Sequence, residues 1–354
     1  MIHRPRRIPF TAREHLPPVP NAAGVRLLLP RRGASANLGG RVVVITGANS
    51  GIGKETALAL AGMGATVVMA SRDPARGSAA VAEVAAATGS TDLHDLRLDL
   101  ASLDSIDAFA DTVLERFDHL DVLVNNAGLV LGRRRETVDG FEETVGVNHL
   151  GPFHLTRRLL DRLVASAPAR IVNVTSVAHK GATAGMLLAD LQSELSYAQM
   201  EAYAKSKLAN VLFTAELARR LDGTGVTTNC VHPGIIRSRF ARDGDARGWL
   251  RLVYPLGAPF MVSSKRGAQT SVFLASAPEI QDVSGAYFVR RHQRLTSPTG
   301  RDATAATWLW DESERLLGAA GRAYLPGRGR STPLEPEVRA GTPPTPGLLG
   351  PGGA

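Results

Sequence analysis

The chain has 354 residues, 44% of them hydrophobic, which is enough for one large domain or two ordinary ones with a sizeable core. Its formal net charge of +8 comes from the two ends, because residues 1–40 hold seven arginines and one glutamate, and residues 321–354 hold four arginines and two glutamates. The body between them is formally neutral, which argues against a nucleic-acid-binding function.

The cysteine and histidine content limits the other classes. A single cysteine, Cys230, excludes an intramolecular disulfide and is typical of a reducing compartment. The histidines are scattered without metal-ligand spacing, so we expect no metal site. No apolar run near the N-terminus is long enough for a signal peptide or a membrane span, which predicts a cytoplasmic protein. Residues 1–38, rich in arginine and proline, and residues 321–354, rich in proline and glycine, are predicted to be disordered tails around one domain at 39–320.

From Arg41 onward, short β-branched runs alternate with helical patterns. This alternation predicts an α/β fold, a single Rossmann-type doubly wound parallel sheet flanked by helices. The first unit is a strand at 41–45, a glycine-rich turn at 46–53 and a helix from about 52 to 63. A glycine-rich turn between a buried strand and a helix N-terminus lets a phosphate approach backbone N–H groups, although a plain turn is the alternative. We predict cofactor contacts from six residues of this turn: Gly47, Asn49, Ser50, Gly51, Ile52 and Gly53.

The second strand, at 66–70, ends in Ser71-Arg72-Asp73. A hydroxyl followed by a guanidinium suits a 2′-phosphate, whereas free ribose hydroxyls call for a carboxylate at this place. Ser71 and Arg72 therefore favour NADP(H) over NAD(H), unless Arg72 only pairs with Asp73. The third strand ends in Leu98-Asp99-Leu100. Asp99 either caps the helix that begins near residue 102 or contacts the cofactor together with Leu100.

The next two strands end in polar residues. The strand at 120–124 closes in Asn125-Asn126-Ala127-Gly128, at the sheet edge where open α/β folds bind ligands, so Asn126, Ala127 and Gly128 are predicted cofactor contacts. A helical pattern at 140–163 contains Asn148 and Pro152. The proline predicts a disturbed turn that could turn Asn148 toward the cleft.

The strand at 170–175 delivers Ser176. His179 lies nearby, but no Gly-x-Ser-x-Gly elbow surrounds Ser176, which argues against a hydrolase. The strand at 226–231 ends in His232-Pro233-Gly234. His232 is as consistent with a structural role as with a chemical one, and Pro233 and Gly234 are predicted to approach a flat cofactor ring. The apolar run at 249–262 is predicted to form a lid or one wall of an apolar pocket. Contact with a bilayer surface is the less favoured alternative. A last strand is expected at 285–289 and a last helix at 303–317.

The most informative segment is a helical pattern at 201–221 that carries Tyr203 and Lys207. Residues four apart face the same way on a helix, and a fixed ammonium favours a phenolate, so the pair could exchange a proton with an alcohol or a ketone. A solvated pair on an ordinary helix surface is the alternative. Lys205 lies on a different helical face and is expected to be solvated.

These motifs stand in one order along the chain, and the chain from about 41 to 317 resembles the short-chain dehydrogenase/reductase family. Three segments are similar to the retinol-dehydrogenase-like branch of that family: 48–57, 207–213 and 267–270. The resemblance implies four catalytic residues, Asn148, Ser176, Tyr203 and Lys207. Tyr203 would transfer the proton, Ser176 would hydrogen-bond the substrate oxygen, and Asn148 would anchor a water that relays protons from Lys207. Tyr203 and Lys207 would also contact the cofactor.

The resulting prediction is an NADP(H)-dependent oxidoreductase that transfers a hydride between the nicotinamide and a hydrophobic alcohol or carbonyl compound. A homo-oligomer is the default expectation. The alternative from another class is a non-catalytic NADP-binding regulatory protein on the same fold, which would be expected to lack the tyrosine or the lysine.

Overall fold

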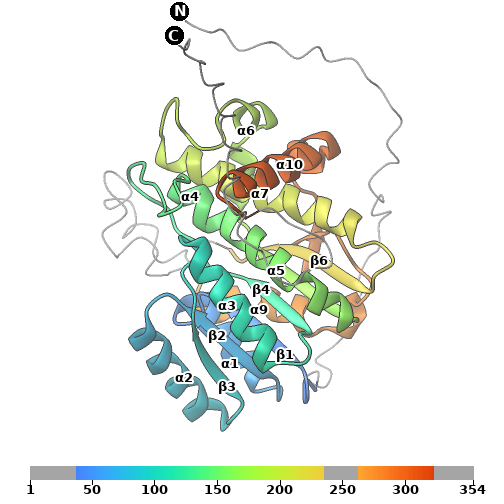
Figure 1. The fold of residues 1–354 in the computed structure, drawn as a ribbon. Helices are drawn as coiled ribbons and strands as arrows, with labels where there is room; N and C mark the ends of the chain where they lie inside the picture. The colour runs from blue at the N-terminus through green and yellow to red at the C-terminus, as the bar shows by residue number, and fades with distance from the viewer. Residues whose placement is uncertain (1–36, 235–261, 323–354) are drawn as a thin grey trace, which may run out of the picture.

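An eight-stranded sheet runs through the middle of the computed structural model, with helices on both faces (Figure 1). The structure describes residues 37–234 and 262–322. The strands lie in the order β3-β2-β1-β4-β5-β6-β7-β8, and all neighbours are parallel except β7 and β8. Their bounds are β1 Val42–Thr46, β2 Thr66–Ser71, β3 Leu93–Arg97, β4 Val122–Asn125, β5 Ala169–Val174, β6 Val226–His232, β7 Tyr287–Val289 and β8 His292–Arg294. The order reverses between β1 and β4, which is where doubly wound sheets bind ligands.

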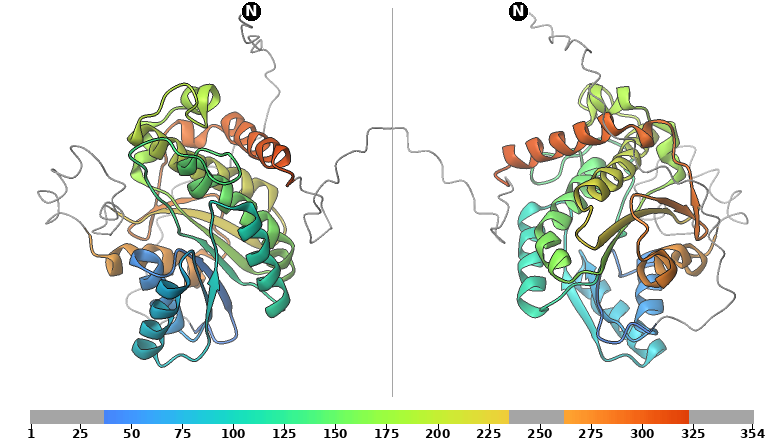
Figure 2. Two further views of the ribbon diagram at one scale, coloured as in Figure 1. Left: turned by 60° about the vertical axis from the view of Figure 1, so that its left-hand side comes forward. Right: turned by 90° about the vertical axis from the view of Figure 1, so that its right-hand side faces the viewer.

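The helices form two layers. One layer is α1 Gly51–Ala61, α2 Pro74–Thr88 and α9 Ser264–Ser276. The other is α3 Leu103–Arg116, α5 Gly151–Ala165, α7 Gln199–Arg220 and α10 Ala303–Ala319. Two short helices, α4 Glu143–Val145 and α6 Ala184–Asp190, lie before α5 and α7. The orange-red α10 packs along α7 on the outside of its layer (Figure 2). No helix within the described ranges is long and apolar enough to cross a membrane.

The two-residue period of the strands divides the core. In β1, Val42 and Val44 pack against the layer with α5 and α7, while Val43 and Ile45 pack against the layer with α1 and α9. Both faces are therefore covered, as the near-continuous apolar runs of the parallel strands require. The predicted single doubly wound parallel sheet is confirmed.

Some details of the elements differ from the prediction, and other predictions lie outside the described residues. The predicted helix at 140–163 is α4, a π-helical turn at Gly146–Leu150 and α5. The antiparallel strand β8 was not predicted. Leu38, placed in the disordered leader, is 8% exposed and packs against the core. The described residues leave out the rest of the leader, nearly all of the tail at 321–354, and the run at 249–262 except for its last residue.

Candidate active site

The glycine-rich turn joins the end of β1 to the start of α1. Gly47 and Gly51 have φ of 65° and 57°, in the left-handed region that glycine tolerates. A Cβ on Gly53 would lie 2.3 Å from the Gly47 carbonyl oxygen, so only glycine fits there, whereas a Cβ on Gly51 would meet no atom within 4 Å. The N-cap Ser50 makes no side-chain cap hydrogen bond, and the first turn of α1 carries no acidic residue. The backbone N–H groups in the first turn of α1 are thus left to bind an anion. The phosphates of a dinucleotide fit this position.

Asn126 fixes this turn from the neighbouring strand. Its side-chain amide donates to the carbonyl oxygens of Thr46 and Gly47, at 2.8 and 3.4 Å. The Thr46 hydroxyl in return accepts the backbone N–H groups of Asn126 and Ala127, each at 3.0 Å. The structure therefore brings Asn126 and Ala127 to the glycine turn, with the Asn126 side chain holding the turn.

The end of β2 offers an exposed guanidinium. The Ser71 hydroxyl is buried and donates to the Asp73 carbonyl oxygen at 3.2 Å, so it is engaged within its own turn. Asp73 caps α2 by accepting the Arg76 N–H at 3.1 Å, and its ion pair is with Arg76 at 3.7 Å. The alternative pairing of Arg72 with Asp73 is therefore not the one formed. Arg72 is exposed, so its guanidinium is accessible to a phosphate group at this strand end.

The end of β3 excludes the capping role for Asp99, and its contact with the cofactor stays a prediction. Ser102, not Asp99, is the N-cap of α3, since its hydroxyl accepts the Ser105 N–H. The half-buried Asp99 carboxylate accepts the Ala101 N–H at 3.0 Å. Leu100 is buried, and its carbonyl oxygen lies 2.7 Å from where a Cβ on Gly151 would stand.

Asn148 lies in the π-helical turn, which confirms the predicted disturbance before Pro152. Its fully buried amide accepts the Leu129 N–H at 2.7 Å and donates to the Leu129 carbonyl oxygen at 2.9 Å and the Ser206 hydroxyl at 3.0 Å. Asn148 thus links the segment after β4 to α7. Both amide hydrogens are committed to these bonds, and the predicted water relay stays a prediction.

The four predicted catalytic residues converge. The Tyr203 hydroxyl hydrogen-bonds the Ser176 side chain, and Lys207 Nζ lies 5.6 Å from the centre of the Tyr203 ring. The same ammonium donates to the Val174 carbonyl oxygen at 3.2 Å. A Cβ on Gly128 would lie 3.1 Å from Asn148 Oδ1 and 3.2 Å from Lys207 Nζ, so these two groups meet across Gly128.

The pKa of Tyr203 differs from the expectation, in which Lys207 lowers it. Burial raises the pKa of Tyr203 above its usual 10.0, and the hydrogen bond with Ser176 opposes this only in part. Burial also lowers the pKa of Lys207 to about 8. At neutral pH Tyr203 is therefore a protonated phenol, able to donate a proton beside Ser176.

Two histidines that the sequence left unassigned hold the backbone at Ser176. His179 is fully buried, and its Nδ1 lies 2.6 Å from the Ser176 carbonyl oxygen while its Nε2 accepts the Ser297 N–H at 3.3 Å. His232 Nδ1 accepts the Val177 N–H at 3.3 Å. Both sides of one peptide unit are thus bonded to imidazoles. The signal in the sequence was their position, since His179 follows the end of β5 and His232 is the last residue of β6.

Lys205 is not solvated as expected. It is 1% exposed, and its ammonium donates to the Asp190 carbonyl oxygen at 2.6 Å and lies 3.7 Å from the Glu201 carboxylate. It anchors the end of α6 to α7. Leu187 of α6 is likewise a core residue at 1% exposed.

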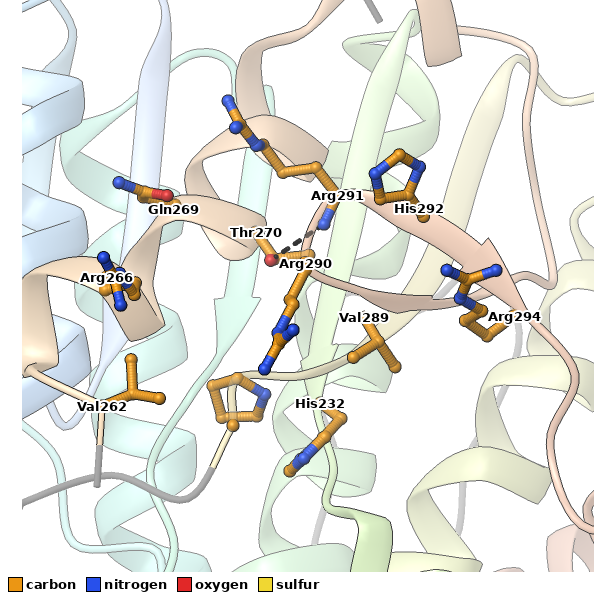
Figure 3. A pocket seen from close by; sticks show the side chains of 12 residues that line it. His232, Val262, Arg266, Gln269, Thr270, Val289, Arg290, Arg291, His292 and Arg294 are labelled. Carbon is orange, nitrogen blue, oxygen red and sulfur yellow. Dashed lines mark hydrogen bonds between the residues drawn. The ribbon is translucent and has the colours of Figure 1, made fainter. Parts of the chain in front are cut away.

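Pro233 and Gly234 follow β6 and line a cavity of about 830 Å³ (Figure 3). Gly234 has φ of 99°, which favours glycine. His232 is on the same wall, and burial is the main cause that lowers its pKa to about 4. His232 is therefore a neutral hydrogen-bond acceptor, which favours the structural role over the chemical one.

The family model described as short chain dehydrogenase matches residues 41–247. The chain belongs to the short-chain dehydrogenase/reductase family. It is similar to Retinol dehydrogenase 12 of Homo sapiens, at 48% identity over 284 residues covering 80% of this chain and 88% of that protein. It is also similar to Retinol dehydrogenase 13 of Mus musculus, at 43% identity over 305 residues covering 85% and 90%. This short-chain dehydrogenase is thus a hydride-transfer oxidoreductase that is similar to retinol dehydrogenases.

Solved structures share the fold of this dehydrogenase. A crystal structure of a putative uncharacterized protein from Mycobacterium Paratuberculosis matches with a TM-score of 0.64 and 35% identity over 80% of this chain and 96% of that one. The Pseudomonas aeruginosa RhlG/NADP active-site complex matches with a TM-score of 0.58 and 27% identity over 71% and 95%.

Proposed function

We propose that this protein is an NADP(H)-dependent oxidoreductase that interconverts a hydrophobic alcohol and its aldehyde or ketone. The observation that carries the proposal is the convergence of Tyr203, Ser176 and Lys207 at the sheet edge that also holds the glycine turn. A non-catalytic protein on this fold would have no need to keep a phenol, a hydroxyl and an ammonium in contact.

Each residue of the site has its own role in this reaction. The cofactor supplies the hydride chemistry, and the glycine turn, Arg72 and the Pro233–Gly234 segment would hold it. In reduction, Tyr203 donates its proton to the carbonyl oxygen; in oxidation, its phenolate takes the hydroxyl proton. Ser176 donates a hydrogen bond to the same oxygen and aligns it. Lys207 places a positive charge beside the ring, which favours the phenolate when it forms.

Two observations support a hydrophobic substrate. The relatives named retinol dehydrogenases act on an apolar alcohol by their names. Met186, in the segment between Ser176 and Tyr203, is half-buried, and Leu188 is 50% exposed, so apolar surface is available on that segment. A hydrophobic alcohol or carbonyl compound fits both.

The activity is tested by following NADPH absorbance with a panel of apolar aldehydes and ketones that includes retinal. We expect oxidation of NADPH by the native chain and a loss of at least about a hundred-fold in Tyr203→Phe, because the ring remains and only the proton donor is removed. Tyr197→Phe is the matched control, since Tyr197 bonds the Leu131 carbonyl oxygen rather than Ser176. Full activity of Tyr203→Phe would show that the assignment is wrong, and no turnover with any carbonyl would favour the non-catalytic alternative.

The cofactor preference is tested by Arg72→Ala. The loss of a charge-assisted phosphate contact should cost about 1.5–3 kcal/mol in NADPH binding, or about ten- to a hundred-fold, with NADH little affected. Arg76→Ala is the control, because Arg76 pairs with Asp73 on the same surface. An equal loss for both cofactors would contradict the 2′-phosphate assignment.

A further inference from the structure

The cavity beyond Pro233 and Gly234 has a one-sided charge. Its described lining holds four arginines and no carboxylate: Arg266, Arg290, Arg291 and Arg294. None of the four forms an ion pair with a carboxylate in the described part of the chain. The body of the protein is formally neutral, so these four arginines form a local excess of positive charge.

The backbone that carries two of these arginines is in an unusual conformation. Val289 pairs with His292 in the β7–β8 hairpin, so Arg290 and Arg291 form a two-residue turn. Their φ angles are 51° and 65°. Such a turn needs the left-handed region at both positions and favours Asn-Gly, not two side chains with a Cβ and a long aliphatic stem. Non-glycine residues kept in this region cluster at ligand sites.

The turn is also held against the opposite wall. The Arg291 N–H donates to the Thr270 hydroxyl of α9 at 3.2 Å. Figure 3 shows the Arg290 side chain extending from the turn toward His232, with Arg266 on the α9 side of the cavity and the Arg291 side chain directed away. Arg290 is close enough to His232 to contribute to its lowered pKa. The hairpin therefore presents a guanidinium to a cavity whose other polar groups are cationic or neutral.

We propose that this cavity binds an organic oxyanion, a phosphate monoester or a carboxylate, held by Arg290 and Arg266. A guanidinium presents paired N–H donors that match two oxygens of either group. The cavity volume of about 830 Å³ is in the range of small-molecule sites. That the ligand lies beside the nicotinamide end of the cofactor rests on the proposed function, whereas the oxyanion site itself does not.

The experiment uses the full chain saturated with NADPH, so that phosphate contacts of the cofactor site are filled. Hexyl phosphate and hexanoate are titrated while the melting temperature and the heat of binding are recorded. We expect the native chain to bind at least one of them and the double variant Arg290→Asn/Arg291→Gly to bind it about ten-fold or more weakly. The same variant should melt roughly 2–4 °C higher, because Asn and Gly relieve the left-handed turn. If the two arginines were merely structural, the variant would not combine weaker binding of the ligand with a higher melting temperature.

The control Arg116→Asn/Arg315→Asn removes two exposed arginines from other surfaces and should bind like the native chain. Vesicles of phosphatidylglycerol and of phosphatidylcholine distinguish a lipid headgroup from a free anion. Binding to the anionic vesicles that is lost in the turn variant assigns the site to a headgroup. No binding of any probe by the native chain, or undiminished binding by the turn variant, would overturn the proposal. If the native chain binds hexyl phosphate but turns over no carbonyl, the site stands and the proposed activity fails.

Discussion

At the scale of single residues, two histidines hold the peptide unit that follows Ser176. The peptide between Ser176 and Val177 has its carbonyl oxygen beside His179 and its N–H bonded to His232. Because Nε2 of His179 accepts the Ser297 N–H, its proton is on Nδ1 and is donated to the Ser176 carbonyl oxygen. The buried imidazole thus joins Ser176 to the segment after β8.

We expect His179→Phe to lower kcat about ten-fold with little change in the KM for NADPH, because the ring still packs against Tyr287 but no longer donates to Ser176. His179→Asn keeps an N–H donor at the Nδ1 position and should recover most of the loss. Steady-state kinetics of the three proteins measure this. If kcat falls equally in both variants, His179 contributes packing only. If the KM for NADPH rises by the same factor as kcat falls, His179 acts on the cofactor.

Lys207 is costly to bury before the cofactor binds. Its pKa is lowered from 10.5 to about 8, so the folded chain carries a penalty of about 3 kcal/mol wherever the group is charged, below pH 8. Between pH 8 and 10.5 the unfolded chain binds one proton more than the folded chain, and stability contributed by this group therefore rises with pH. We expect Lys207→Met to abolish turnover yet to stabilise the cofactor-free chain at pH 7, with the gain shrinking toward pH 10.

Denaturant unfolding at several pH values checks this prediction. Lys205→Met is the matched control, because Lys205 is equally buried but donates to the Asp190 carbonyl oxygen at 2.6 Å and pairs with Glu201. Its removal leaves that carbonyl without its donor and should destabilise the chain at every pH. If Lys207→Met is also destabilised at pH 7, the burial penalty is smaller than the packing and the hydrogen bond that the lysine provides.

At the scale of elements, the sequence predicted what depends on local composition. The β-branched runs of β1, β2, β5 and β6 were recognised, and Pro152 correctly marked the turn that became π-helical. The strand β8 was missed because His292, Gln293 and Arg294 have low strand propensity and the arginine turn lacks the expected glycine. Here pairing with β7 overrides local preference.

The errors at individual sites share one physical cause. Helical spacing put Lys205 on a different face from Tyr203, but it could not show that α6 covers that face. Spacing likewise put a charge beside Tyr203, but it could not weigh the effect of burial on the pKa of the phenol. The proximity of Asn148, Ser176, Tyr203 and Lys207 was predictable, because Ser176 follows β5, Asn148 lies in the turn marked by Pro152, and Tyr203 and Lys207 are four residues apart on α7. Their catalytic roles stay predictions. What surrounds each of these residues depends on contacts distant in the chain. The cytoplasmic location and the homo-oligomer stay predictions.

At the scale of the whole molecule, the last helix is joined to the site through the core. The Ser313 hydroxyl of α10 lies 2.9 Å from Nε2 of His149, the residue after Asn148. One turn earlier, the ring of Trp310 contacts Phe153 and Phe213 at centroid distances of 4.9 and 6.0 Å. The turn that holds Asn148 is therefore packed against a helix more than 150 residues away in sequence.

We expect Trp310→Ala to cost about 3–5 kcal/mol of unfolding free energy, because it opens a cavity between α5, α7 and α10 and removes the ring under the Arg220 guanidinium, 4.2 Å from its centre. Trp308→Ala, at a half-buried position on the same helix, should cost clearly less. If α10 supports the π-helical turn, Trp310→Ala will also lower kcat at temperatures where the chain is still fully folded by circular dichroism. Unchanged kcat under those conditions would show that α10 stabilises the fold without acting on Asn148.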